Sequence, residues 1–199
     1  MNNTLRYILL KPLSMLYGIG VGLRNKLFDL GIYQSSKSDI STISIGNITV
    51  GGTGKTPHAE YLLSFLSSKI NTAYVSRGYK RSTTGFRLAD EQSNASTIGD
   101  EAYQIKRKFQ NVTVAVDANR LNALKKLSNL KNAPKVVVLD DAYQHRSLHP
   151  DLNILLIDYN RLTYLDSMLP LGELREPSNN TDRADIIIFT KCPETIMPV

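Results

Sequence analysis

Hydrophobic and polar positions along the chain follow two alternating patterns. Short, continuous apolar runs rich in β-branched residues are typical of strands that are buried on both faces, as in a parallel sheet. Between several of these runs, apolar residues recur at helical spacing. The pattern predicts strands at residues 40–48, 72–76, 112–116, 135–141, 153–158 and 185–191.

The helical spacing predicts helices at residues 55–68, 101–109 and 118–130. Alternating strands and helices imply right-handed crossovers between parallel strands. The expected fold class is therefore α/β, with a doubly wound and mainly parallel sheet. We interpret residues 178–182 as an exposed loop, and we find no internal repeat.

The first 33 residues are rich in Leu, Ile, Tyr and Met, with cations spaced among them. Their longest uncharged run lies between Lys11 and Arg24, which is shorter than the roughly 20 apolar residues that a membrane span needs. This composition favours a helix that lies in the lipid interface. A helix packed on the domain is the alternative. We expect an amphipathic, membrane-proximal helical segment at residues 1–36 and an α/β domain at residues 37–199.

Composition narrows the class of protein. Of the 199 residues, 42% are hydrophobic and 21% are charged, which supports a folded core and excludes wholesale disorder. Cys192 is the one cysteine, so no intrachain disulfide is expected. The net charge of +6 is concentrated in residues 1–37 and 61–89. Such a charge indicates nucleic acid, anionic lipid or a phosphorylated ligand as partner, although a solvated basic face explains it equally well.

A glycine-rich loop follows the first expected strand, in the stretch SIGNITVGGTGKTP at residues 44–57. It carries the end of the phosphate-binding pattern G-x-x-x-x-G-K-[ST], but Thr49 replaces the first glycine. In such a loop, backbone N–H groups and the following helix N-terminus hold phosphates, the lysine reaches the β- and γ-phosphates, and the hydroxyl residue binds Mg²⁺. The predicted nucleotide-binding residues are Thr49, Val50, Gly51, Gly52, Thr53, Gly54, Lys55 and Thr56.

Acidic and basic side chains follow other expected strands. Asp140 and Asp141 end the strand that begins near residue 135, where a carboxylate of a phosphate-loop site holds Mg²⁺ directly or through water. Asp100 and Glu101 are open to two interpretations: Asp100 is a helix cap, or the pair divides the roles of base and metal ligand. Cations at several strand ends indicate recognition of more phosphate than ATP carries, with the candidates Arg77, His145 and Arg175.

These motifs together resemble the tetraacyldisaccharide 4'-kinase family, over nearly the whole chain. The motifs that carry the resemblance, in the family's order, are SIGNITVGGTGKTP, SRGYKR, GDEAYQIKRKF, VAVDANR, VVVLDDAYQHRSLHPDLNILLID, LPLGELREP and ADIIIFTKCP. The resemblance implies transfer of the γ-phosphate of ATP, with Mg²⁺, to the 4'-hydroxyl of a tetraacyl glucosamine disaccharide 1-phosphate. The product would be lipid IVA, in lipid A biosynthesis. It also implies a peripheral enzyme on the cytoplasmic face of the bacterial inner membrane, which would bring the basic N-terminal segment to an anionic membrane surface.

The resemblance also assigns roles to residues. Asp100 would be the base for the acceptor hydroxyl, and Glu101 would lie with Thr56 on the metal side. The expected catalytic residues are Lys55, Asp100, Asp140 and Asp141. The expected substrate-binding residues are Arg77, Arg120, His145 and Arg175.

Family members continue into a C-terminal lobe that helps to close the active site. Nothing in the 199 residues corresponds to it, so we expect a kinase domain that lacks this lobe and does not reach full turnover alone.

Two other classes of function stay open. A regulatory GTPase is one, because TKCP at residues 190–193 weakly resembles the guanine-reading N-K-x-D. A basic nucleic-acid-binding module is the other, although the expected aromatic stacking residues are not evident. Our expectation is that the protein binds no nucleic acid.

Overall fold

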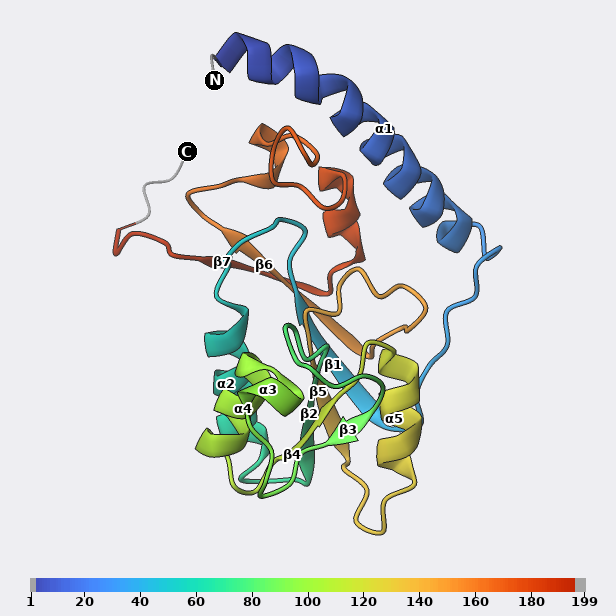
Figure 1. The fold of residues 1–199 in the computed structure, drawn as a ribbon, viewed down its shortest axis with the longest axis vertical. Helices are drawn as coiled ribbons and strands as arrows, with labels where there is room; N and C mark the ends of the chain where they lie inside the picture. Colours follow the sequence, from blue (N-terminus) through green and yellow to red (C-terminus); the bar gives the residue numbers. More distant parts are fainter. Residues whose placement is uncertain (1–2, 196–199) are drawn as a thin grey trace.

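A seven-stranded sheet forms the centre of the computed structural model, which describes residues 3–195 (Figure 1). The strand order is β3-β4-β2-β5-β1-β6-β7, and every neighbouring pair is parallel except β3 with β4. The strands are β1 Ser41–Gly46, β2 Thr72–Ser76, β3 Arg87–Leu88, β4 Thr113–Val116, β5 Val136–Asp140, β6 Leu152–Asp158 and β7 Ile186–Thr190. The doubly wound, mainly parallel α/β fold is confirmed.

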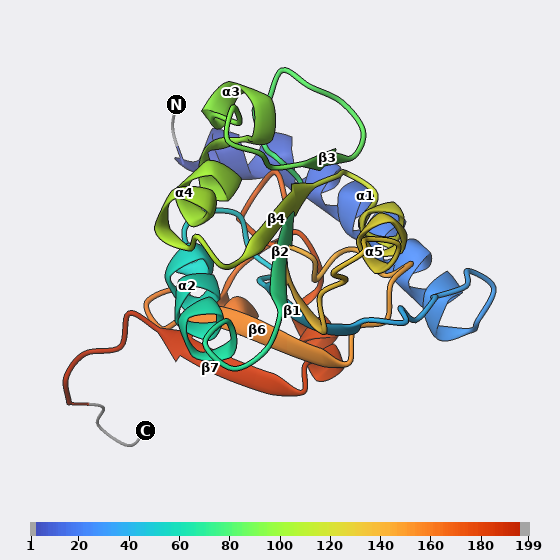
Figure 2. The same cartoon turned by 90° about the horizontal axis from the view of Figure 1, so that it is seen from below.

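Helices cover both faces of this sheet. Helices α2 and α4 lie on one face and α5 lies on the other (Figure 2). The helices are α1 Asn3–Asp29, α2 Lys55–Leu66, α3 Ala95–Ile98, α4 Asp100–Lys108 and α5 Arg120–Ser128, with short 3₁₀ helices at Thr163–Leu165 and Ser178–Arg183. The three helices expected inside the α/β domain are present, and each end lies within two residues of the expectation.

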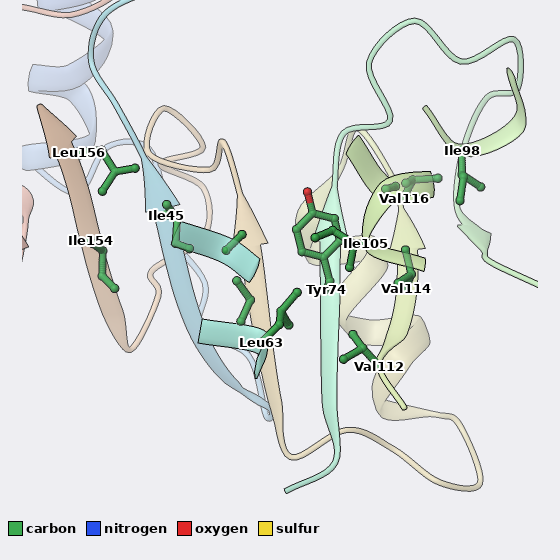
Figure 3. Close-up of a cluster of buried hydrophobic side chains, with 13 residues drawn as sticks. Ile45, Leu63, Tyr74, Ile98, Ile105, Val112, Val114, Val116, Ile154 and Leu156 are labelled. Atoms are coloured by element: carbon green, nitrogen blue, oxygen red, sulfur yellow. The ribbon is translucent and has the colours of Figure 1, made fainter. Parts of the chain in front are cut away.

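Successive side chains of each strand point to opposite faces of the sheet, so the hydrophobic core has two layers. In β2, Tyr74 packs with Leu63 of α2 and Ile105 of α4, whereas its neighbours Ala73 and Val75 pack on the α5 side. Figure 3 shows the first layer, with the Tyr74 ring in its middle and the hydroxyl oxygen at the upper end of the ring. The long, continuous apolar runs of the sequence follow from this burial on both faces.

The strand order places the loop that follows β1 beside the loop that follows β5. From β1 the chain crosses to β2 and β4, and it then returns to insert β5 between β2 and β1. Ile45 of β1 is in register with Asp140 of β5, so the carboxyl ends of these strands are adjacent. Open α/β sheets bind ligands at such a point, where the chain changes direction.

Helix α1 lies across the carboxyl-end loops of the domain (Figure 1). It contacts them through a docking stripe of small or polar residues at helical spacing: Ser14, Gly18, Val21 and Asn25. Ser14 Oγ donates to the carbonyl of Met168 (2.7 Å), and Asn25 Nδ2 donates to Glu176 Oε2 (2.9 Å). Large side chains that α1 exposes are Leu5, Tyr7, Ile8, Leu9, Leu13, Met15, Leu16, Tyr17, Ile19 and Leu23.

The two interpretations of the N-terminal segment are therefore compatible, because Ser14 and Asn25 of α1 contact the domain while large apolar residues of the same helix are exposed. Within residues 3–195, no helix has the length and apolarity that crossing a membrane requires.

Some expectations for individual elements are wrong. β7 is not buried on both faces: Ile186, Ile187 and Phe189 are each at least 44% exposed, because β7 is the last strand at its edge of the sheet. Residues 178–182 are not an irregular loop, since they form most of the 3₁₀ helix Ser178–Arg183. Strand β3 and helix α3 were not expected at all.

Candidate active site

The glycine-rich loop connects β1 to α2 and is shaped for an anion. Gly54 has the left-handed conformation (φ 84°) that turns the chain into the first helical residue, Lys55. Within the described residues, no hydrogen bond occupies the N–H groups of Gly51, Gly52 or Gly54. Val50 differs, because its N–H donates to the carbonyl of Glu173 (2.8 Å). The N–H groups that are free to hold a phosphate therefore lie in the second part of the predicted loop.

Lys55 extends from the start of α2 to the end of β5. Its Nζ lies 3.4 Å from Asp141 Oδ1 and donates to Asn47 Oδ1 (3.2 Å). Arg175 NH1 holds the same carboxylate at 3.0 Å. Partial burial alone would raise the pKa of Asp141, but Lys55 and Arg175 outweigh it and lower the pKa below its ordinary value. Asp141 is thus an anion held between two cations beside the loop.

Asp140 has a different environment from its neighbour. It is 1% exposed, and Tyr74 donates its hydroxyl to Asp140 Oδ2 (2.6 Å). Burial raises the pKa of Asp140 more than the Tyr74 hydrogen bond, Lys55 and Arg120 lower it. Oδ1 of the same carboxylate is buried and has no hydrogen-bond partner among residues 3–195. A buried carboxylate oxygen of this kind leaves a position for a water or a cation.

The side chains around Asp140 fit Mg²⁺, although no group of three or more acidic, His or Cys residues within residues 3–195 forms a ready-made metal site. Magnesium at phosphate-loop sites keeps several waters and takes one or two carboxylates plus phosphate oxygens, so such a group is not required. Asp140 Oδ1 is a buried oxygen that could coordinate the ion, and Glu101 lines the same cavity as Asp140. The pKa of Glu101 is raised, first by loss of hydration at the cavity wall and then by Asp140.

One cavity of about 830 Å³ joins these groups. Lys55, Asp140, Asp141 and Glu101 line it near the loop. Further lining residues come from distant segments: Arg24 on α1, Arg77 after β2, Arg120 at the start of α5, and His145, Gln144 and Arg175 from the loops after β5 and β6. The four predicted substrate residues therefore share one cavity with Val50 and Lys55 of the predicted phosphate loop, whereas the glycines of the loop do not line it.

Arg120 and His145 are held by the fold as well as facing the cavity. Arg120 is 3% exposed and donates to the backbone carbonyls of Asp117 (2.6 Å) and Asp140 (2.9 Å). The backbone N–H of Arg120 donates to His145 Nε2 (3.3 Å). Burial lowers the pKa of His145, and the arginines Arg120, Arg24 and Arg77 lower it further. The His145 ring is therefore neutral near pH 7.

Asp100 does not line the large cavity. It borders an adjoining cavity of about 110 Å³ that is also lined by Ser76, Gly78 and Glu101. Gly99 precedes Asp100 with φ 85° and ψ 156°, and a Cβ at Gly99 would lie 2.9 Å from the Tyr79 carbonyl oxygen. Only glycine allows this close approach, which sets the start of α4 against the loop after β2.

Comparison with known proteins reveals a consistent set of relatives. The family model of tetraacyldisaccharide-1-P 4'-kinase matches residues 6–198. The chain belongs to this family.

Individual relatives agree with this assignment. A tetraacyldisaccharide 4'-kinase of Phocaeicola vulgatus is 53% identical over 192 residues, covering 96% of this chain and 52% of the relative. A tetraacyldisaccharide 4'-kinase of Flavobacterium johnsoniae is 50% identical, and the match covers 98% of this chain and 57% of the relative. The crystal structure of LpxK from Aquifex aeolicus in complex with ATP is 37% identical, with a TM-score of 0.87, covering 94% of this chain and 59% of that one. The chain thus spans about half the length of the curated relatives it matches.

Within this family fold, two residues that sequence reasoning missed hold the predicted ones in place. Tyr74 supports Asp140, and Asn47 is fully buried and accepts from Lys55. A tyrosine inside the apolar run TAYVS was the available signal for Tyr74, because a buried hydroxyl needs a partner. Nothing in the sequence near Asn47 identified the lysine as its partner.

Proposed function

We propose that the chain is the nucleotide-binding part of a tetraacyldisaccharide 4'-kinase. It transfers the γ-phosphate of ATP to the 4'-hydroxyl of a tetraacyl glucosamine disaccharide 1-phosphate, giving lipid IVA. The observation that carries this proposal is that Lys55, at the end of the glycine-rich loop, pairs with Asp141 and lines one cavity together with Asp140 and Asp141. The same cavity is also lined by arginines from other segments of the chain.

ATP binds with its phosphates on the N–H groups of the loop and on Lys55. Asp141 and Asn47 hold Lys55 and keep its ammonium group at the loop. Arg175 also contacts Asp141, so this carboxylate keeps a cationic partner when Lys55 turns to the phosphates. The ATP complex of LpxK from Aquifex aeolicus supports ATP as the nucleotide.

Mg²⁺ is the proposed cofactor, and it would neutralise charge on the β- and γ-phosphates when bound. Asp140 Oδ1, Glu101 and the Thr56 hydroxyl are the residues that would hold it, directly or through water. Tyr74 orients the Asp140 carboxylate so that Oδ1, which has no protein partner, is the oxygen available for this role.

Asp100 is the proposed base. Transfer to a sugar alcohol requires removal of the hydroxyl proton as the new bond forms, and a positioned base contributes about 10²–10⁴-fold. Asp100 is exposed at the entrance of the smaller cavity, next to Glu101. Glu101 lines both the smaller and the larger cavity, so Asp100 is adjacent in sequence to a residue of the cavity that Lys55 also lines.

Helix α1 is the proposed contact with the membrane surface. Its docking stripe holds it to the domain, while exposed apolar side chains and the cations Arg6, Lys11 and Lys26 point away from the core. A helix of this kind binds an anionic bilayer in the interface plane. The protein is accordingly proposed to lie peripherally on the cytoplasmic face of the inner membrane, where its acylated substrate is embedded.

The decisive experiment is transfer of labelled γ-phosphate from ATP to tetraacyl disaccharide 1-phosphate in mixed micelles, using this chain and any longer form of the same gene product. Product carrying a second phosphate at the 4' position supports the proposal. ATP hydrolysis without phosphorylated lipid in both preparations overturns it.

A further inference from the structure

Arg161 is a cation that lies against the glycine-rich loop, outside the large cavity. It follows β6, the strand that pairs with β1 in the sheet. A Cβ at Gly51 would lie 3.2 Å from Arg161 NH2 and 3.3 Å from Arg161 NH1. The guanidinium therefore packs on the backbone of Gly51, whose N–H group is one of those free to hold a phosphate.

Two carboxylates hold the arginine at this position. Its Nε lies 3.5 Å from Oδ2 of Asp158, the last residue of β6, and its NH1 pairs with Glu173. The carbonyl of Glu173 in turn accepts from the N–H of Val50 in the phosphate loop (2.8 Å). The segment that carries Glu173 is thus bonded to the loop and keeps the guanidinium beside it.

Part of the guanidinium is available to a ligand. Within residues 3–195, Arg161 NH2 donates no hydrogen bond, whereas NH1 donates to Glu173. The pair of Arg161 with Glu173 is partly exposed, at 34% and 46% of the two side chains, and ion pairs this exposed contribute little to stability. A phosphate carries more negative charge than a carboxylate and matches the planar fork of arginine, so it can replace Glu173.

Asp158 does not require Arg161 as its counter-charge. Lys191 Nζ lies 2.7 Å from Asp158 Oδ2. The hydrogen bond from Lys191 is the largest cause of the lowered pKa of Asp158, and the charge of Arg161 contributes less. The position of Arg161 on the loop is therefore not explained by neutralisation of this carboxylate.

We propose that Arg161 is a further catalytic residue, whose guanidinium binds the γ-phosphate of ATP and stabilises its negative charge during transfer. An arginine supplied from the same chain has this role in some other phosphate-loop enzymes. The inference rests on the proposed function and deepens it. It also explains the glycine at position 51, since a side chain there would displace the guanidinium.

The test compares nucleotides with and without the γ-phosphate, so that it does not depend on turnover. Binding of ATP and of ADP, each with Mg²⁺, is measured by calorimetry on this chain. Arg161→Gln should weaken ATP binding about 10- to 100-fold, as expected for one lost charge-assisted contact, and leave ADP binding unchanged. Arg161→Lys keeps the charge without the planar fork and should restore part of the loss.

Lys191→Gln is the matched control, because Lys191 pairs with the same carboxylate of Asp158 and is not among the groups that a Cβ at Gly51 would meet. This variant should keep the wild-type ratio of ATP affinity to ADP affinity. An unchanged ratio in Arg161→Gln, an equal loss for both nucleotides, or an equal change of the ratio in Lys191→Gln would each overturn the proposal.

The same measurements separate this proposal from the kinase assignment. If the wild type binds neither ATP nor ADP, the proposed nucleotide site fails, and the role of Arg161 fails with it. If the wild type binds both and Arg161→Gln keeps their ratio, the nucleotide site stands and only the role of Arg161 is removed. In a preparation that transfers phosphate, Arg161→Gln should lower kcat by roughly 10³-fold or more, and a near-normal kcat would overturn the proposal.

Discussion

Tyr74→Phe tests how the fold maintains a buried carboxylate for the metal side of the site. The substitution keeps the ring that packs between α2 and α4 and removes only the hydroxyl that donates to Asp140 Oδ2 at 2.6 Å. Because Oδ1 already lacks a partner, the variant leaves both carboxylate oxygens of Asp140 without a side-chain donor. A hydrogen bond to a charged group contributes about 1.5–3 kcal/mol, so we expect this loss in the free energy of unfolding. For a domain of this size it lowers Tm by about 3–12 °C.

The loss should depend on pH in a defined direction. The folded-state pKa of Asp140 is raised by burial, and the Tyr74 hydrogen bond partly opposes that rise. Because folding raises this pKa, the protonated Asp140 carboxyl contributes to the free energy of unfolding. This contribution is fully present below the pKa of the unfolded state and is lost as pH rises through the pKa of the folded state. Removing the hydroxyl raises the folded pKa further. The deficit of the variant should therefore grow as pH rises through the folded-state pKa of Asp140, and it should be smaller below that pKa, where the carboxyl is protonated.

Urea unfolding of wild type and variant across this pH range measures the effect. Tyr61→Phe is the control, since Tyr61 lies on α2 and is 72% exposed. Equal stability of Tyr74→Phe and wild type at neutral pH would refute the reasoning, as would a deficit that does not change with pH.

Three further predictions concern the loop, the base and the helix. Gly99→Ala should destabilise the protein by about 1–3 kcal/mol, because its φ of 85° and the nearby Tyr79 carbonyl exclude a Cβ; thermal unfolding checks this, and an unchanged Tm contradicts it. In a preparation with kinase activity, Asp100→Asn should lower kcat by about two to four decades with little change in ATP binding. Glu101→Gln should instead shift the dependence of activity on Mg²⁺ concentration. A near-normal kcat for Asp100→Asn would contradict the assignment of Asp100 as the base. Deleting residues 1–33 should abolish flotation with anionic vesicles and retain ATP binding; unchanged flotation would place the membrane contact elsewhere.

The parts of the site that depend on parallel strands could be predicted from sequence. Lys55 and Asp141 are 86 residues apart, yet each follows an apolar strand, and the carboxyl ends of such strands meet at one edge of a sheet. These predictions needed only periodicity, the glycine-rich loop and the position of each charge after its strand.

Contacts that depend on distant partners could not be predicted in this way. The apolar residues and the spaced cations of the N-terminal segment predicted a helix, but the docking of α1 to the domain through Ser14 and Asn25 depends on Met168 and Glu176, which are more than 150 residues away. Strand β3 has two residues and exists only through its antiparallel pairing with β4. Helix α3 has a local signal that was overlooked, since Asn94 and Thr97 form a reciprocal cap.

The central claim is that the loop from Thr49 to Thr56 binds the phosphates of ATP through Lys55. Calorimetric titration of this chain with ATP in the presence of Mg²⁺, with GTP as competitor, tests it directly by comparing wild type with Lys55→Ala. We predict that ATP binds to the wild type in preference to GTP. Loss of the lysine should weaken this binding by about 10- to 100-fold or more, the effect of removing a charge-assisted phosphate contact. Wild-type ATP affinity in Lys55→Ala, or binding of GTP in preference to ATP, would contradict the account.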